Sequence, residues 1–163
     1  MERTDMDVFS EEFNELLVDA YRSLTEIEEQ MVRSTSSLDL SINEIHLIEA
    51  VGRNRSSSPP GRTISDLSES VGLSLPSVTI AVNKLVRKGY VEKRRSPLDG
   101  RVVLVTLTRR GEKVDRAHRY FHQKMIAAVM NEMTEEEKRV MAKGIIKLND
   151  FFNKKLARTD ENE

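Results

Sequence analysis

The sequence predicts a mainly α-helical protein in which a two-helix motif and a β-hairpin lie between long amphipathic helices. Three observations predict this fold class. Apolar residues recur at steps of three and four over most of the chain, cap residues mark several helix starts, and one segment near the middle is typical of two short strands around a turn. We therefore expect a winged helix-turn-helix between N- and C-terminal helices that form a bundle.

The N-terminal stretch carries one long apolar stripe without a break until Ser34. The stripe consists of Phe13, Leu16, Leu17, Ala20, Tyr21, Leu24, Ile27 and Met31. This spacing predicts a single amphipathic helix. A second helix is predicted from Ser41 to Gly52, because Glu44 follows Ser41 at the spacing of a capping box.

Two further helices are predicted after a Ser- and Pro-rich segment, 53–62, which we interpret as a mobile loop. Thr63 caps the shorter helix, Gly72 ends it, and Ser74 caps the longer one. The longer helix directs an apolar set toward the core, namely Val78, Val82, Leu85 and Val86. Its other faces carry Ser77, Thr79, Asn83, Lys84 and Arg87. Two helices joined by a tight turn in this way form the helix-turn-helix pattern.

A β-hairpin is predicted next, with strands at 90–94 and 101–107 around a Pro- and Gly-containing turn. A hairpin in this place is the wing of a winged helix, and Arg101 near its tip is expected in or beside a narrow minor groove. Asp99 is expected to orient an arginine, with Arg94 as the partner. The predicted DNA contacts are Thr63, Ser74, Ser77, Thr79, Asn83, Lys84, Arg87, Arg94, Arg95, Asp99 and Arg101.

Charge is segregated along the 163 residues, although the formal net charge is only -1. Residues 53–113 hold 13 Lys and Arg against five Asp and Glu, whereas the rest of the chain is acidic. A basic middle favours contact with a polyanion, since Lys and Arg release counterions from phosphates. The chain has no Cys, which excludes disulfide scaffolds and thiolate metal sites, and no apolar run of membrane-spanning length, so we expect a cytoplasmic protein without membrane contact.

The predicted organisation has three parts. Residues 1–36 and 112–157 form a helical dimerisation region, residues 37–111 form the winged helix-turn-helix, and residues 158–163 form a flexible tail. The long helices cannot bury their stripes against the small winged segment alone, so we expect a homodimer. A two-fold dimer matches a pseudo-palindromic operator in double-stranded DNA.

Three segments resemble the MarR family of winged-helix transcription regulators: 85–93, 99–101 and 107–111. They are similar to the family's basic helix end followed by Gly and an aromatic residue, its D-x-R wing and its L-T-x-x-G helix start. Segments 41–46, 101–103 and 116–122 are most similar to the FabT-like repressors of bacterial fatty-acid synthesis. This resemblance implies a repressor for which long-chain acyl-acyl carrier protein is the co-repressor, and no cofactor required for DNA binding.

The three histidines suggest two further sites. His118 and His122 share a helix face, within reach of one Zn²⁺. Resemblance to zinc-sensing MarR members implies a metal site made by Glu28, His46, His118 and His122, while contacts that line a cleft are the alternative. A third interpretation is an effector pocket made by Leu24, Ile27, Ile45, His46, His118, Phe121, His122 and Met125.

Other functions are kept as alternatives to the fatty-acid interpretation. The regulator could respond to zinc or to another small molecule, or the winged helix could serve as an interaction module that does not bind DNA. An enzyme is not expected, because the chain contains none of the P-loop, G-x-G-x-x-G and G-x-S-x-G motifs. The operator, the regulated genes and the sign of regulation do not follow from these residues.

Overall fold

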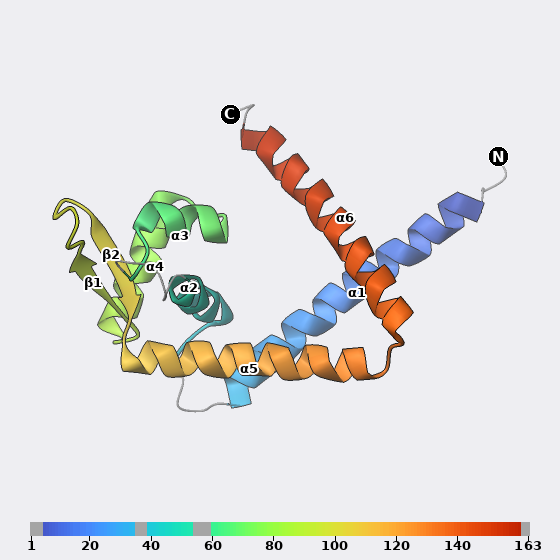
Figure 1. Cartoon of the computed structure of the whole chain (residues 1–163), viewed down its shortest axis with the longest axis horizontal. Helices are drawn as coiled ribbons and strands as arrows, with labels where there is room; N and C mark the ends of the chain where they lie inside the picture. Colours follow the sequence, from blue (N-terminus) through green and yellow to red (C-terminus); the bar gives the residue numbers. More distant parts are fainter. Residues whose placement is uncertain (1–4, 35–38, 54–59, 161–163) are drawn as a thin grey trace. The chain divides into compact units, whose positions relative to one another are not determined.

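The computed structural model describes residues 5–34, 39–53 and 60–160 of the chain. Within them the elements are, in order, α1 (Asp5–Ser34), α2 (Ile42–Gly52), α3 (Ile64–Val71), α4 (Leu75–Arg87), β1 (Val91–Arg95), β2 (Val103–Leu107), α5 (Arg109–Asn131) and α6 (Glu135–Asp160) (Figure 1). This order confirms the mainly helical winged helix-turn-helix. The chain divides into two compact units, Met1–Arg116 and Ala117–Glu163, so α5 contributes to both.

Two of the predicted helix starts in the first unit, at Ser41 and Thr63, are built as capping boxes. The Ser41 N–H donates to Glu44 Oε2 at 2.8 Å, and the Glu44 N–H donates to Ser41 Oγ at 3.3 Å. Thr63 and Asp66 exchange the same two bonds at 3.0 and 3.1 Å. Gly72 ends α3 in the left-handed region at a φ of 65°. These local bonds satisfy backbone groups that a helix end leaves without partners, which is why cap residues marked the boundaries in the sequence.

The core of the first unit is made by α2, α3, α4 and the hairpin, which lie together in Figure 1. Ile48, Leu67, Leu85, Tyr90 and Val105 are fully buried there. The prediction that Val86 also belongs to this core is wrong, since its side chain is 37% exposed. Each helical residue advances by about 100°, and Val86 therefore lies at the edge of the face that its buried neighbours define.

The hairpin is a two-stranded antiparallel sheet in which Val91 pairs with Leu107 and Arg95 with Val103. Arg62 adds a bridge to the other edge of β2: its N–H donates to the Val105 carbonyl at 3.0 Å, and its carbonyl accepts from the Val105 N–H at 2.8 Å. These two hydrogen bonds join Arg62, the last residue of the predicted loop, to the wing. Residues 54–59 of that loop lie outside the described residues.

The second unit consists of the later part of α5 and of α6. Thr134 caps α6 as predicted, since its N–H donates to Glu137 Oε2 at 2.7 Å. The helix continues to Asp160, into the segment 158–163 that we expected to be a tail, because no Gly or Pro follows Phe152 to stop it. Residues 161–163 lie outside the described part. No helix in the described ranges has the apolar length needed to cross a bilayer.

Candidate nucleic-acid interface

Helix α4 presents a polar N-terminus next to a buried apolar face. Ser74 caps the helix by accepting from the Ser77 N–H at 3.4 Å, and the hydroxyls of these two residues lie 2.9 Å apart. The Thr79 hydroxyl donates to the Leu75 carbonyl at 2.7 Å, so its oxygen is left as an acceptor. The hydroxyls of Ser74, Ser77 and Thr79 therefore stand at the end of the helix that a helix-turn-helix directs into the major groove.

The exposed side of α4 also carries an apolar residue that sequence reasoning did not assign. Ile80 is 68% exposed, although Val78 and Val82 beside it are fully buried. Its position outside the buried stripe was the signal that could have identified it. An exposed apolar side chain on a reading helix is suited to contact a thymine methyl group.

Lys84 and Arg87 both lie exposed toward the end of α4, but their surroundings differ. Lys84 Nζ lies 3.2 Å from Glu44 Oε1, and Lys88 Nζ lies 2.9 Å from Glu44 Oε2. Burial opposes ionisation of Glu44, but the Ser41 N–H and the two ammonium groups outweigh it and lower the pKa of this carboxyl. Glu44 thus ties the start of α2 to α4, and Lys84 has a protein partner as well as solvent exposure.

Thr63, another predicted DNA contact, is half-buried at the start of α3. Hydrogen bonds donated by the Thr63 N–H, and then by the Thr63 hydroxyl, lower the pKa of Asp66. The hydroxyl oxygen already accepts from the Asp66 N–H at 3.1 Å. The hydroxyl proton is directed to the Asp66 carboxylate, so the Thr63 side chain that we predicted as a DNA contact already has partners within the start of α3.

The wing places its arginines in distinct environments. Asp99 Oδ1 accepts from the Arg101 N–H at 2.9 Å, whereas Arg94 Nη2 lies 2.6 Å from Glu92 Oε1. The expected Arg94–Asp99 pair is therefore wrong, because the Asp99 carboxylate closes its own turn and Glu92 is nearer to Arg94. Arg95 Nη1 donates to the Gly100 carbonyl at 3.5 Å. Arg101 is exposed at the tip.

A second cluster joins the end of α4 to the start of α5. Arg110 Nη1 donates to the Lys88 carbonyl at 2.9 Å, and its guanidinium lies 4.2 Å from the centroid of the Tyr90 ring. The Tyr90 hydroxyl donates to Asp39 Oδ1 at 3.0 Å. Burial, and then this bond to Asp39, raise the pKa of Tyr90. Lys88, Tyr90 and Arg110 lie in the motif segments 85–93 and 107–111, but the sequence did not predict that they and Asp39 meet, because the four residues come from distant parts of the chain.

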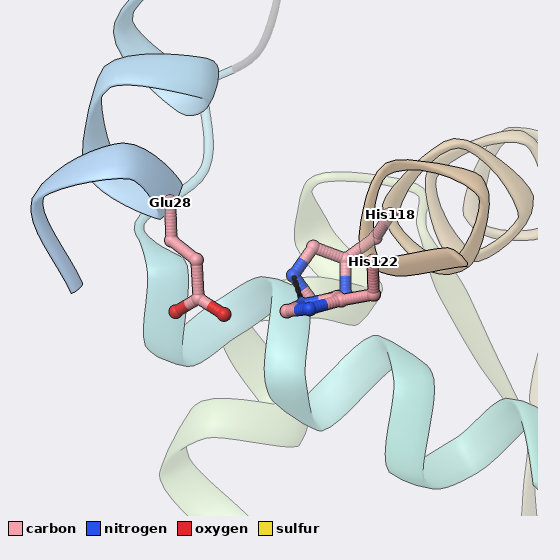
Figure 2. Close-up of side chains that lie close together, drawn as sticks. All are labelled: Glu28, His118 and His122. Atoms are coloured by element: carbon pink, nitrogen blue, oxygen red, sulfur yellow. Dashed lines mark hydrogen bonds between the residues drawn. The ribbon is translucent and has the colours of Figure 1, made fainter. Parts of the chain in front are cut away.

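The residues of the predicted metal site fall in two pairs, one in each unit. In the first unit Glu28 Oε2 lies 3.6 Å from His46 Nε2. In the second unit the Nε2 atoms of His118 and His122 lie 3.2 Å apart on α5; Figure 2 draws this pair and also Glu28 of α1. Two nitrogen ligands of one tetrahedral Zn²⁺ are separated by roughly 3.3 Å, so the histidine pair has a spacing that fits a zinc ion.

The residues of the predicted effector pocket lie in both units and in different environments. Ile45 belongs to the core of the first unit, Leu24 is half-buried and Ile27 is 44% exposed. Phe121 and Met125 are half-buried residues of α5. The first unit has a mostly apolar hollow of about 260 Å³ elsewhere, between α2, α3 and α4. Its lining is Asn43, Glu44, His46, Leu47, Val71, Leu73, Val78 and Ala81, and His46 alone was predicted.

Comparison with known proteins identifies the fold and the family. The model of the MarR family matches residues 38–102. The structure of Streptococcus pneumoniae FabT in complex with DNA is 35% identical, with a TM-score of 0.80, and the match covers 89% of this chain and 98% of that one. The chain belongs to the MarR family. It is a DNA-binding transcriptional regulator and not an enzyme.

Further relatives agree with this assignment. The regulator BilQ of Clostridium symbiosum (strain WAL-14163) is 30% identical over 101 residues, which are 61% of this chain and 66% of that protein. The uncharacterised regulator YwhA of Bacillus subtilis (strain 168) is 33% identical over 86 residues, or 53% of this chain and 62% of its own length. The chain thus spans about two thirds of these relatives. The S. aureus MepR–DNA complex is 18% identical with a TM-score of 0.68 over 86% of this chain and 97% of that one, which shows the shared fold.

Proposed function

We propose that this MarR-family regulator represses genes of fatty-acid biosynthesis as a homodimer, with long-chain acyl-acyl carrier protein as its co-repressor. The observation that carries the proposal is the similarity to pneumococcal FabT, which covers nearly the whole of that chain. The segments 41–46, 101–103 and 116–122, which resemble fatty-acid repressors, support the same group. A regulator of this kind acts on the chromosome, hence in the cytoplasm.

DNA binding is assigned to the exposed side of α4 and to the wing. The exposed polar residues Ser77 and Asn83 and the half-buried Thr79 contact base edges or nearby phosphates. Arg87, with the wing residues Arg94, Arg95 and Arg101, contacts the backbone, and Arg101 enters or lies beside the minor groove. Lys84 is also assigned to the DNA backbone: its ammonium group is exposed, so it can contact a phosphate while it stays paired with Glu44.

A homodimer accounts for the apolar side chains that the long helices leave exposed. On α6 the exposed set is Val140, Ile145, Ile146, Phe151, Phe152 and Leu156. On α1 it includes Phe9, Phe13, Leu16 and Tyr21. Contiguous exposed apolar residues are typical of protein interfaces. Association of two copies would place two α4 helices in successive major grooves of a pseudo-palindromic operator.

Fluorescence anisotropy of the chelator-treated protein tests the co-repressor. The duplexes are DNA from upstream of its own gene and of fatty-acid-synthesis genes, each titrated with and without long-chain acyl-acyl carrier protein. We expect the acylated carrier to tighten binding, and the same carrier without an acyl chain to leave it unchanged. Equal affinities in all three titrations would contradict the fatty-acid assignment, but not the DNA-binding one.

Zinc response is the second candidate function, and the spacing of the two imidazoles on α5 favours it. His118 and His122, with Glu28 and His46, would supply one carboxylate and three imidazole ligands. When bound, zinc would hold the His118 and His122 imidazoles of α5 together. Zinc would be supported as the effector if restoring Zn²⁺ tightened DNA binding by the wild-type protein and had no such effect on His118→Ala.

A further inference from the structure

Asn83 on the reading helix is held by a residue of the wing. Lys93 of β1 donates from Nζ to Asn83 Oδ1 at 2.7 Å, and both side chains are exposed. An ammonium group has donors only, so the amide oxygen and not the amide nitrogen must face it. Lys93 was not among the predicted DNA contacts, and its partner lies ten residues away across the end of α4.

The contact determines which half of the amide remains for another partner. A carboxamide is planar, with its oxygen and its NH₂ group on opposite sides of the carbon that joins them. With the oxygen directed to Lys93, the NH₂ group with its two donors is directed to the other side. Without Lys93 the amide could rotate by half a turn and present either group.

This orientation matters because bases differ in what they present in the major groove. Guanine presents two acceptors, N7 and O6, whereas adenine presents one acceptor and one donor. An asparagine pairs with adenine by using its oxygen and its nitrogen together. An asparagine whose oxygen is already bound to an ammonium group is better suited to acceptors alone.

We propose that Lys93 determines specificity through Asn83, so that the pair selects guanine over adenine at one position of each operator half-site. The proposal rests on the assignment of α4 as the reading helix, but it requires neither acyl carrier protein nor zinc. Lys93 is here a positioning residue: it fixes the amide, and Asn83 contacts the base.

Simple phosphate binding by Lys93 makes a different prediction. A phosphate contact adds affinity for every sequence, and its loss weakens all duplexes alike while it reduces the salt dependence of binding by about one ion. Loss of a positioning contact changes the preferred base at one position. The two roles are therefore distinguished by selectivity rather than by affinity.

The experiment is selection of bound duplexes from a randomised library by the full-length protein, at low salt, followed by sequencing. The proteins are wild type, Lys93→Met, Asn83→Ala, the double variant and Lys113→Met, an exposed lysine on α5 that serves as a control for the lost charge. Circular dichroism confirms that each variant is folded. Competition between duplexes that differ only at the selected position then measures the preference.

We expect wild type and Lys113→Met to select guanine at that position, and Lys93→Met to accept adenine as well. The preference for guanine should fall about fivefold, the equivalent of one hydrogen bond. Asn83→Ala should lose selectivity at the same position, and adding Lys93→Met to it should change nothing further there.

Three results would overturn the inference. Lys93→Met could retain the wild-type preference, or could weaken all duplexes equally with a smaller salt dependence, which would make Lys93 a phosphate contact. Asn83→Ala could leave the selected sequence unchanged, which would show that Asn83 does not contact a base. If the wild-type protein selected no sequence at all, the assignment of α4 as the reading helix would be overturned as well. The anisotropy titration with acyl carrier protein is a separate test, and its failure would contradict only the fatty-acid proposal.

Discussion

The winged segment and the last helix differ in how far their apolar side chains are buried. Leu67, Val78, Val82 and Leu85 of α3 and α4 are fully buried within the first unit, whereas Val140, Ile145 and Phe151 of α6 are 53–64% exposed. Helices with similar apolar spacing therefore differ in whether one chain suffices to cover them. The winged segment is therefore held by its own core, whereas the exposed apolar residues of α6 are those that we assign to the second copy of the proposed homodimer.

Truncation of a core residue gives the largest effect expected from this comparison. Leu67→Ala should lower the free energy of unfolding by about 2–5 kcal/mol, because it leaves a cavity among buried neighbours. Ile145→Ala should instead weaken association of the two copies. Urea unfolding and sedimentation equilibrium of both variants provide the measurements. A similar loss of stability in both, with unchanged association, would contradict the distinction.

Gly111 at the start of α5 and Gly144 in α6 differ in how closely their surroundings are packed. A Cβ at Gly111 would overlap the Tyr90 carbonyl oxygen at the root of the wing, while a Cβ at Gly144 in α6 meets nothing within 4 Å. Gly111→Ala should therefore destabilise the protein by about 1–3 kcal/mol. Gly144→Ala should stabilise it by about 0.5–1 kcal/mol, since alanine favours a helix interior. Thermal unfolding compares them, and equal midpoints would count against this packing of the wing.

Removal of the wing-tip charge should affect DNA binding and leave the dimer intact. Arg101 is exposed and its backbone N–H, rather than its guanidinium, bonds to Asp99. We expect Arg101→Ala to weaken operator binding by about 1–3 kcal/mol in an anisotropy titration. Lys147→Ala on α6 is the control for an exposed charge on the other region. An unaltered salt titration of Arg101→Ala would remove this arginine from the interface.

The smallest effect concerns acid stability of the first unit. The pKa of Glu44 is lowered from its ordinary 4.5, so the folded state holds its proton more weakly than the unfolded state. The stability from this group is present above about pH 4.5 and is lost as pH falls through the folded-state pKa. Glu44→Gln should flatten the acid side of a stability profile measured by urea unfolding. Glu69→Gln, on the exposed face of α3, should retain the wild-type slope.

Much of the fold could be predicted from the sequence because its signals are local. The Ser41–Glu44 and Thr63–Asp66 boxes and the Gly72 turn each depend on residues within a few positions of one another. Val86 shows the limit of such reasoning, because periodicity marks a stripe but does not say how wide a face the neighbouring elements cover.

The resemblance to the family, the order of the elements and the segregation of basic residues toward the DNA-binding segment all follow from the amino-acid sequence. Which polar groups meet follows only from the packed structure. Glu44 with Lys84 and Lys88, Arg110 with Tyr90 and Lys88, and Asp99 with the Arg101 N–H rather than with Arg94 are all pairings of this kind. The physical reason is range: a cap or an apolar stripe is specified by neighbours along the chain, whereas an ion pair or an oriented amide such as Asn83 depends on distances of a few ångströms between elements that packing alone brings together.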